Sequence, residues 1–232
     1  MIAGVDGCPA GWVVTMAPAW PPQQVCLAVC RDFAVVVATT APCTLVVVDI
    51  PIGLPNPGQH RQCDVEARKI LGRGAPRVFH TPPRELLEIP DYRAFAQRYR
   101  DAYGQGVSIQ TFQLRTRLLD VDALMTPALQ ERIREYHPEL VWRHLAGRLL
   151  PSKHTPEGLE IRRRLLQPHV PALDAVRPRR AKAAGTFKEH DLLDALVGLE
   201  LAHRMTRQPA AARRLPSKPP RDARGLRMEI WY

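Results

Sequence analysis

The 232-residue sequence contains no long hydrophobic run. A transmembrane helix needs about 20 consecutive apolar residues, and no segment approaches that length. The first residues, MIAGVDG, also lack the basic segment with which a secretory signal peptide begins. We therefore expect a cytoplasmic protein that does not enter the membrane.

Cysteine is sparse, and its placement argues against disulfides and against a structural zinc site. The chain has 5 cysteines, all in its first third. Cys26 and Cys30 are four positions apart, but no Cys or His pair follows at the spacing of a second pair of zinc ligands. Reduced and mostly buried thiols are expected.

Acidic residues are outnumbered by basic ones, 23 to 33, which gives a formal net charge of +10. Basic residues gather at Arg177, Arg179, Arg180, Lys182 and Lys188, and again in a tail from Arg207 to Arg227. This balance favours a polyanionic partner such as nucleic acid. A generally solvated, arginine-rich surface explains the same composition equally well.

The first fifty residues predict a sheet with a particular order of strands. Apolar runs at 2–6 and 11–17 are joined by the turn sequence GCPAG, which is typical of a β-hairpin. A third strand is expected at 25–30 and a short helix at 32–41, where Asp32 is a suitable N-cap. The continuous β-branched run at 44–51 predicts a strand buried on both faces.

The rest of the chain is predicted to be mainly helical. Helices are expected at 61–72, 91–104, 108–125, 155–169 and 188–205. The segment 131–140 is expected to contain a strand that ends at His137-Pro138 and is followed by a helix. The region from about 55 to 127 lies between core strands and is interpreted as a helix-rich insertion. The predicted organisation is a single α/β domain over 1–205 and a basic, irregular tail over 206–232, in which LRMEIWY could add a closing strand.

Two aspartates follow buried strands and mark a candidate site. Asp6 ends the first strand, and Asp49 ends the strand at 44–51. In an open α/β sheet, residues just beyond the carboxyl ends of the strands usually line the site. An ionised carboxylate beside apolar strands is costly unless it is paired or bound to metal. A turn-capping role for either aspartate alone is an equal alternative.

Asp191 and Asp194 add a second acidic pair. A separation of three residues puts both carboxylates on one face of the helix at 188–205. Asp191 lies in the first turn, where the helix dipole stabilises an acid without any metal. Together the four aspartates could hold two Mg²⁺ or Mn²⁺ ions, which activate water in phosphodiester hydrolysis.

Several motifs resemble, in order, those of the family called domain of unknown function 429, whose members are predicted ribonuclease H-like nucleases. They are GVDGCPAGW, VVVDIPIGLP, RQCDVEARKILG with RVFHTPP, EYHPEL with PSKHTPEG, and HDLLDAL. The resemblance spans residues 2 to about 205. It implies a ribonuclease H-like mixed sheet flanked by helices, with Asp6, Asp49, Asp191 and Asp194 as metal ligands.

The family-like segments contain further candidate site residues. Glu135 could add a ligand and His137 a proton-transfer group, although a strand-end Glu and a His packed beside proline are the alternatives. Lys153 could hold a phosphate as a point charge, or simply belong to a helix-capping loop. Substrate phosphates could also be contacted by a recurrent basic set, which would otherwise form a salt-bridged surface: Arg61, Arg68 and Arg77.

These features predict a metal-dependent nuclease that hydrolyses phosphodiester bonds of DNA or RNA by a two-metal-type mechanism. One alternative is a phosphotransfer enzyme like actin or the sugar kinases, but the turn after Asp6 lacks a Ser or Thr to contact phosphate. The other is a non-catalytic nucleic-acid-binding protein, which would gain nothing from clustered negative charge near a polyanion. A resolvase-like role would require a homodimer.

Overall fold

The computed structural model describes residues 1–171, 173, 176 and 186–232. Of the predicted basic cluster, Lys188 is among the described residues, and four members lie outside them: Arg177, Arg179, Arg180 and Lys182. The chain forms two compact units. Unit 1 comprises residues 1–50, 132–213 and 231–232, and unit 2 comprises residues 51–131 and 214–230.

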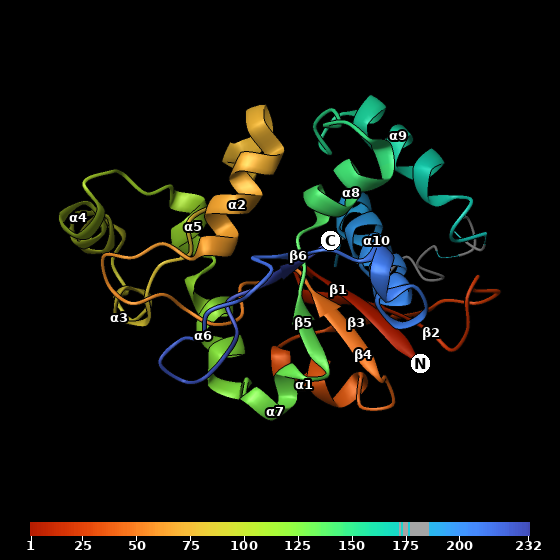
Figure 1. The fold of residues 1–232 in the computed structure, drawn as a ribbon, viewed down its shortest axis with the longest axis horizontal. Coiled ribbons are helices and arrows are strands. Elements are labelled where there is room, and N and C mark those ends of the chain that lie inside the picture. The colour runs from red at the N-terminus through yellow and green to blue at the C-terminus, as the bar shows by residue number, and fades with distance from the viewer. Residues whose placement is uncertain (172, 174–175, 177–185) are drawn as a thin grey trace. The chain divides into compact units, whose positions relative to one another are not determined.

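A five-stranded mixed sheet forms the centre of unit 1 (Figure 1). Its strand order is β3-β2-β1-β4-β5. The strands β1 and β2 form the predicted antiparallel hairpin, and β3 pairs antiparallel with β2. On the other side of β1, β4 pairs parallel with β1, and β5 pairs parallel with β4. Their bounds are β1 Ile2–Cys8, β2 Gly11–Ala17, β3 Cys26–Cys30, β4 Leu45–Val48 and β5 Ile133–Glu135.

Helices cover both faces of this sheet. Val13 packs with Ala195 of the long helix α10, whereas its neighbour Trp12 packs on Phe33 of α1, with ring centroids 5.6 Å apart. Adjacent residues of a strand point to opposite faces, so α10 and α1 lie on opposite sides. The helices of unit 1 are α1 Phe33–Thr39, α8 Pro138–Ala146, α9 Pro156–Leu166 and α10 Glu189–Arg207, followed by the 3₁₀ turn η4 Pro209–Ala211.

Two glycines let α10 approach the sheet closely. A Cβ atom at Gly4 of β1 would lie 2.1 Å from the carbonyl oxygen of Ala195, and one at Gly198 would lie 2.7 Å from the ring of Tyr136. Thr15 of β2 donates its hydroxyl to the Ala195 carbonyl at 3.0 Å. The N-terminal half of α10 is therefore held directly against β1 and β2.

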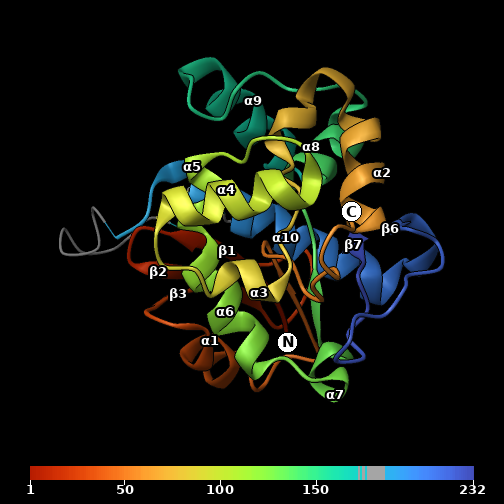
Figure 2. The same cartoon turned by 90° about the vertical axis from the view of Figure 1, so that its left-hand side faces the viewer.

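Unit 2 is mainly helical and contains the whole region from about 55 to 127 predicted as an insertion (Figure 2). Its aromatic core includes Phe95 and Tyr99 of α4. The predicted single helix at 108–125 is divided at Leu114, because the Leu114 amide bonds to the carbonyls of both Gln110 and Thr111. The elements are α2 Gln62–Leu71, η1 Gly72–Arg77, α3 Arg84–Leu87, α4 Tyr92–Tyr103, α5 Ile109–Gln113, α6 Arg115–Leu124 and α7 Pro127–Gln130.

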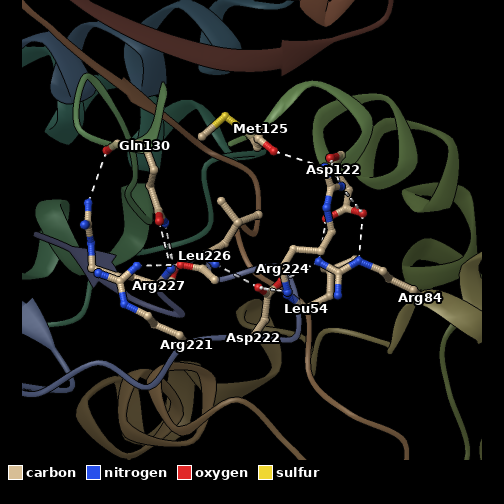
Figure 3. A network of polar contacts seen from close by, with 11 residues as sticks. Leu54, Arg84, Asp122, Met125, Gln130, Arg221, Asp222, Arg224, Leu226 and Arg227 are labelled. Atoms are coloured by element: carbon tan, nitrogen blue, oxygen red, sulfur yellow. Dashed lines mark hydrogen bonds and ion pairs between the residues drawn. The ribbon is translucent and has the colours of Figure 1, made fainter. Parts of the chain in front are cut away.

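Residues 214–230 of the predicted tail belong to unit 2, where hydrogen bonds and an ion pair hold a mostly irregular segment in place. Asp222 receives hydrogen bonds from the amides of Leu54, at 3.1 Å, and Leu226, at 2.8 Å, and it forms an ion pair with Arg84 (Figure 3). Gln130 exchanges hydrogen bonds with the Arg227 backbone, each of 2.8 Å. Two short strands, β6 Arg214–Leu215 and β7 Ile230–Trp231, pair with each other.

No helix of the described part of the chain is long and apolar enough to span a bilayer.

Candidate active site

Asp6 and Asp49 lie beside each other at one edge of the sheet in unit 1. Val5 of β1 is the register partner of Val48 of β4, and the Asp49 amide donates to the Val5 carbonyl at 3.0 Å. The next residues along these parallel strands are Asp6 and Asp49. Neighbouring strands are about 4.8 Å apart, which is why their carboxylates meet and share a hydrogen bond.

Asp194 joins this pair from α10. Asp6 points to the same face of the sheet as Gly4, two residues earlier, where α10 packs against the strand. Asp194 precedes Ala195, which contacts Gly4, and its side chain is fully buried. The close packing that Gly4 and Gly198 permit therefore brings a third carboxylate towards the first two.

Burial and mutual repulsion raise the pKa values of this acidic cluster. The pKa of Asp6 is well above its ordinary value, first because it is buried and then because Asp49 and Asp194 repel its charge. The pKa of Asp49 is also raised, mainly by burial, although His137 and Lys153 partly oppose the shift. A hydrogen bond shared between Asp6 and Asp49 partly offsets the rise in the pKa of Asp49.

Lys153 supplies the positive charge at the centre of the cluster. Its ammonium nitrogen lies 2.6 Å from Oδ2 of Asp194. Burial alone would lower the pKa of Lys153, but Asp194, Asp6 and Asp49 outweigh that effect and raise it. Lys153 is therefore a permanent cation among three carboxylates, and not only the residue of a helix-capping loop.

The loop that carries Lys153 is fixed by α8 and α9. Arg162 of α9 is fully buried, and it donates to Oε1 of Glu139 in α8 at 2.7 Å and to the Pro151 carbonyl at 2.9 Å. A Cβ atom at Gly158 would lie 2.0 Å from the Ser152 carbonyl oxygen, so the loop also packs tightly on the start of α9. These contacts hold Lys153 at the carboxylates.

Two aromatic residues that sequence reasoning missed complete the surroundings of Asp194. Trp142 of α8 donates its Nε1 hydrogen to Oδ1 of Asp194 at 2.7 Å, and the Tyr136 hydroxyl donates to the Asp194 carbonyl at 2.7 Å. The pKa of Tyr136 is well above its ordinary value because of burial and the neighbouring carboxylates. Tyr136 stands within the motif EYHPEL, whereas Trp142 resembles an ordinary core residue of α8 in the sequence.

Asp191 has a different role from Asp194 in this structure. Its Oδ2 accepts the Lys188 amide at 2.8 Å, and its Oδ1 lies 2.8 Å from Nδ1 of His190. These contacts cap the N-terminus of α10, which is the alternative that its position in the first helical turn allowed. Asp191 contributes to the negative field at Asp6 but uses its oxygens for the cap.

Glu135 and His137 lie in and just after the strand next to β4. Glu135 is the last residue of β5, and His137 lies two residues further along the chain. Glu135 is buried, and its proposed role as a ligand stays a prediction. His137 is the N-cap residue of α8 and lies close enough to Asp49 to lower the pKa of that carboxyl. Nδ1 of His137 is buried and has no hydrogen-bond partner among the described residues.

The predicted basic set lies in unit 2. Arg61 is buried and contacts the Cys63 sulfur at 2.9 Å and the Asp64 carboxylate at 3.4 Å. Arg68 donates to the carbonyls of Ala75 and Val78. Arg77 lies in η1 and is half-buried. These contacts give Arg61 and Arg68 structural partners, and a role of the set in substrate binding stays a prediction.

Within the described residues, no group of three His, Cys, Asp or Glu side chains is arranged so that it could hold a metal ion. The carboxylates of Asp194 and Asp191 explain this. Asp194 directs its two oxygens at Trp142 and Lys153, and Asp191 directs its own at the cap. The carboxyls of Asp6 and Asp49, in contrast, share a hydrogen bond with each other.

Comparison with known proteins gives one match. Residues 4–221 match the model of a family described as "Protein of unknown function (DUF429)". No curated protein and no solved structure matches the chain.

Proposed function

The chain belongs to the DUF429 family of proteins of unknown function, and we propose that it is a metal-dependent phosphodiesterase of the ribonuclease H-like class that cleaves nucleic acid. The observation that carries this proposal is the convergence of three carboxylates on Lys153 at one edge of the sheet. The three-strand meander followed by a helix and a buried strand ending in Asp49 supports the ribonuclease H-like assignment. The net charge of +10 supports a polyanionic substrate.

Asp6 and Asp49 fit a single hard divalent cation by the chemistry of their donors. Mg²⁺ is usually held by one or two carboxylates, with water and substrate phosphate oxygens completing its coordination. Burial and repulsion already disfavour two negative charges here, so a cation held by these carboxylates would relieve a cost that the fold imposes. We therefore propose one ion at Asp6 and Asp49, in place of the two expected from the sequence.

When bound, such an ion lowers the pKa of a coordinated water and stabilises negative charge on a phosphoryl oxygen. Lys153 supplies the second positive charge. Asp194 fixes the ammonium group through one of its three hydrogens, and the others can contact a phosphate oxygen. Trp142 and Tyr136 keep Asp194 in position for that task. His137, beside Asp49, can transfer a proton to the leaving oxygen.

A purely structural role explains this cluster poorly. Like charges that are buried together destabilise the folded state, and apolar residues of similar size would pack at these positions without that cost. The unfavourable arrangement of Asp6, Asp49 and Asp194 is therefore better explained by a reaction. The same reasoning argues against a protein that only binds nucleic acid, since crowded carboxylates repel phosphate.

The proposal is tested by cleavage of labelled single-stranded, duplex and branched DNA and RNA with Mg²⁺, Mn²⁺ or EDTA. We expect cleavage that requires metal and that falls at least about 100-fold in Asp6→Asn and in Asp49→Asn. Asp101→Asn is the matched control, because Asp101 is exposed on α4 in unit 2. Activity that persists in Asp6→Asn, or that is lost equally in Asp101→Asn, would exclude the carboxylate cluster as the reaction centre.

A further inference from the structure

A cavity of about 510 Å³ opens in unit 1 at the other end of the sheet from the carboxylates. Parallel strands β1 and β4 begin at this cavity, at Ile2 and just after Thr44, and run towards Asp6 and Asp49. Helix α10 runs the opposite way, from Asp194 to Thr206, about 18 Å at 1.5 Å per residue. The cavity is therefore separate from the candidate active site.

An aromatic pair forms one wall of the cavity. The indole ring of Trp20, in the segment after β2, stacks on the imidazole of His203 in α10, with ring centroids 4.7 Å apart and an interplanar angle of 12°. Both rings line the cavity. Burial lowers the pKa of His203, and Arg207 and His169 lower it further, which favours the neutral imidazole. A flat, neutral stack of this kind accepts another aromatic ring.

The polar groups of the cavity select for charge and for hydrogen-bond donors. Arg207 lines the cavity, and none of the described residues that line it is acidic. Thr206 donates its hydroxyl hydrogen to carbonyls of its own helix, and Thr44 donates its own to the Met1 carbonyl at 3.2 Å. The oxygens of both hydroxyls therefore remain as acceptors. The cavity offers an aromatic plane, a cation and acceptors.

We propose that this cavity binds a nucleotide whose base carries an exocyclic amino group. The base stacks on an outer face of the Trp20–His203 pair, the amino group donates to a threonine oxygen, and the phosphate pairs with Arg207. The volume lies within the range of about 300–1,000 Å³ that is usual for small-ligand sites. The nucleotide is either free in solution or part of a strand, since both present the same chemistry. The proposal does not depend on the carboxylates being catalytic.

Calorimetric titration of the full chain with adenosine monophosphate, adenosine and ribose 5-phosphate tests this site. We expect the monophosphate to bind more tightly than either fragment. Arg207→Gln should weaken the monophosphate about tenfold, to the level of adenosine, and leave adenosine unchanged. Trp20→Ala should weaken both base-containing ligands by about 5- to 150-fold, the equivalent of one base stack. The matched control is Arg31→Gln, because the Arg31 side chain is 85% exposed outside the cavity.

Titration with a strand of five adenine nucleotides distinguishes a nucleotide that is free in solution from one that is part of a strand. Tighter binding of the strand than of the monophosphate, lost in Arg207→Gln, identifies a strand contact, and equal or weaker binding identifies a free nucleotide. Asp6→Asn should bind the monophosphate like the wild type, so failure of the proposed nuclease activity leaves this test intact. No binding of any ligand, unchanged binding in Arg207→Gln, or loss of binding in Asp6→Asn would overturn the proposal. If Trp20→Ala does not fold, Arg207→Gln decides alone.

Discussion

The ammonium group of Lys153 lies 2.6 Å from Oδ2 of Asp194, a carboxylate that no solvent reaches. This pair links the loop between α8 and α9 to the central helix α10. It also gives the acidic cluster a cation that belongs to the chain itself. The pairing is the reason that we assign one metal ion, and not two, to the site.

Removing Lys153 should destabilise the protein by leaving the Asp194 charge without its partner. Breaking a buried ion pair from one side costs on the order of 3 kcal/mol. We expect Lys153→Met to lower the free energy of unfolding by about that amount in metal-free buffer, and Asp194→Asn to restore much of the loss. A double-mutant cycle from urea unfolding measures the coupling. Additive effects of the two substitutions would mean that the pair contributes nothing.

Asp6→Asn should make the metal-free protein more stable at neutral pH. Because the pKa of Asp6 is raised above its ordinary value of 3.8, the folded state holds its proton more tightly than the unfolded state does. That contribution is fully present below the unfolded pKa and is lost as pH rises through the folded pKa. Asparagine does not ionise and avoids the loss.

The measurement for Asp6 is the difference in melting temperature between Asp6→Asn and wild type, in EDTA, from pH 4 to pH 8. We expect the melting temperature of the variant to rise relative to wild type as pH rises. Each kcal/mol of difference in the free energy of unfolding corresponds to about 2–4 °C. A difference that does not change with pH would show that the Asp6 carboxyl is not perturbed by its neighbours.

Trp142→Phe should loosen Asp194 without changing any charge. The substitution removes the Nε1 donor, which is 2.7 Å from Oδ1, and leaves a buried carboxylate oxygen with one partner fewer. Such a loss costs about 1–3 kcal/mol. We expect the free energy of unfolding, measured with urea, to fall by that amount. The fall should be much smaller when the substitution is made in an Asp194→Asn background. Equal drops in both backgrounds would assign Trp142 to packing alone.

Asp222→Asn should release the C-terminal segment from unit 2. The Asp222 carboxylate is fully buried and accepts the Leu54 and Leu226 amides as well as Arg84 (Figure 3). Asparagine keeps only one acceptor oxygen and has no charge. We therefore expect the free energy of unfolding to fall by about 1.5–3 kcal/mol, the contribution of a hydrogen bond to a charged group. Hydrogen exchange over residues 214–230 should rise, with Asp101→Asn as the unaffected control. Unchanged protection of this segment would contradict the role given to Asp222.

The sequence predicts the sheet and the proximity of two carboxylates well because both depend on local patterns. The β-branched run before Asp49 and the hairpin after Asp6 set a register that places the two carboxylates side by side. The capping position of Asp191 is also readable, since it follows from the first turn of α10. These features need only strand order and helix periodicity.

Other features depend on contacts between distant segments, which no local pattern encodes. The approach of Lys153 to Asp194 requires Arg162 and Gly158 to fix the intervening loop. The burial of Arg61 against Cys63 could not be predicted, because a charged residue at a helix start is usually exposed. The order of the C-terminal segment likewise rests on partners about a hundred residues earlier, such as Gln130 for Arg227.

Binding of Mn²⁺ to the full chain, measured by titration calorimetry at pH 7.5, tests the central claim most directly. We predict one ion per chain in the wild type and in Asp101→Asn, no binding in Asp6→Asn or Asp49→Asn, and release of a proton as the ion binds. Two ions per chain, no binding by the wild type, or undiminished binding by Asp6→Asn would contradict a single-ion site at Asp6 and Asp49.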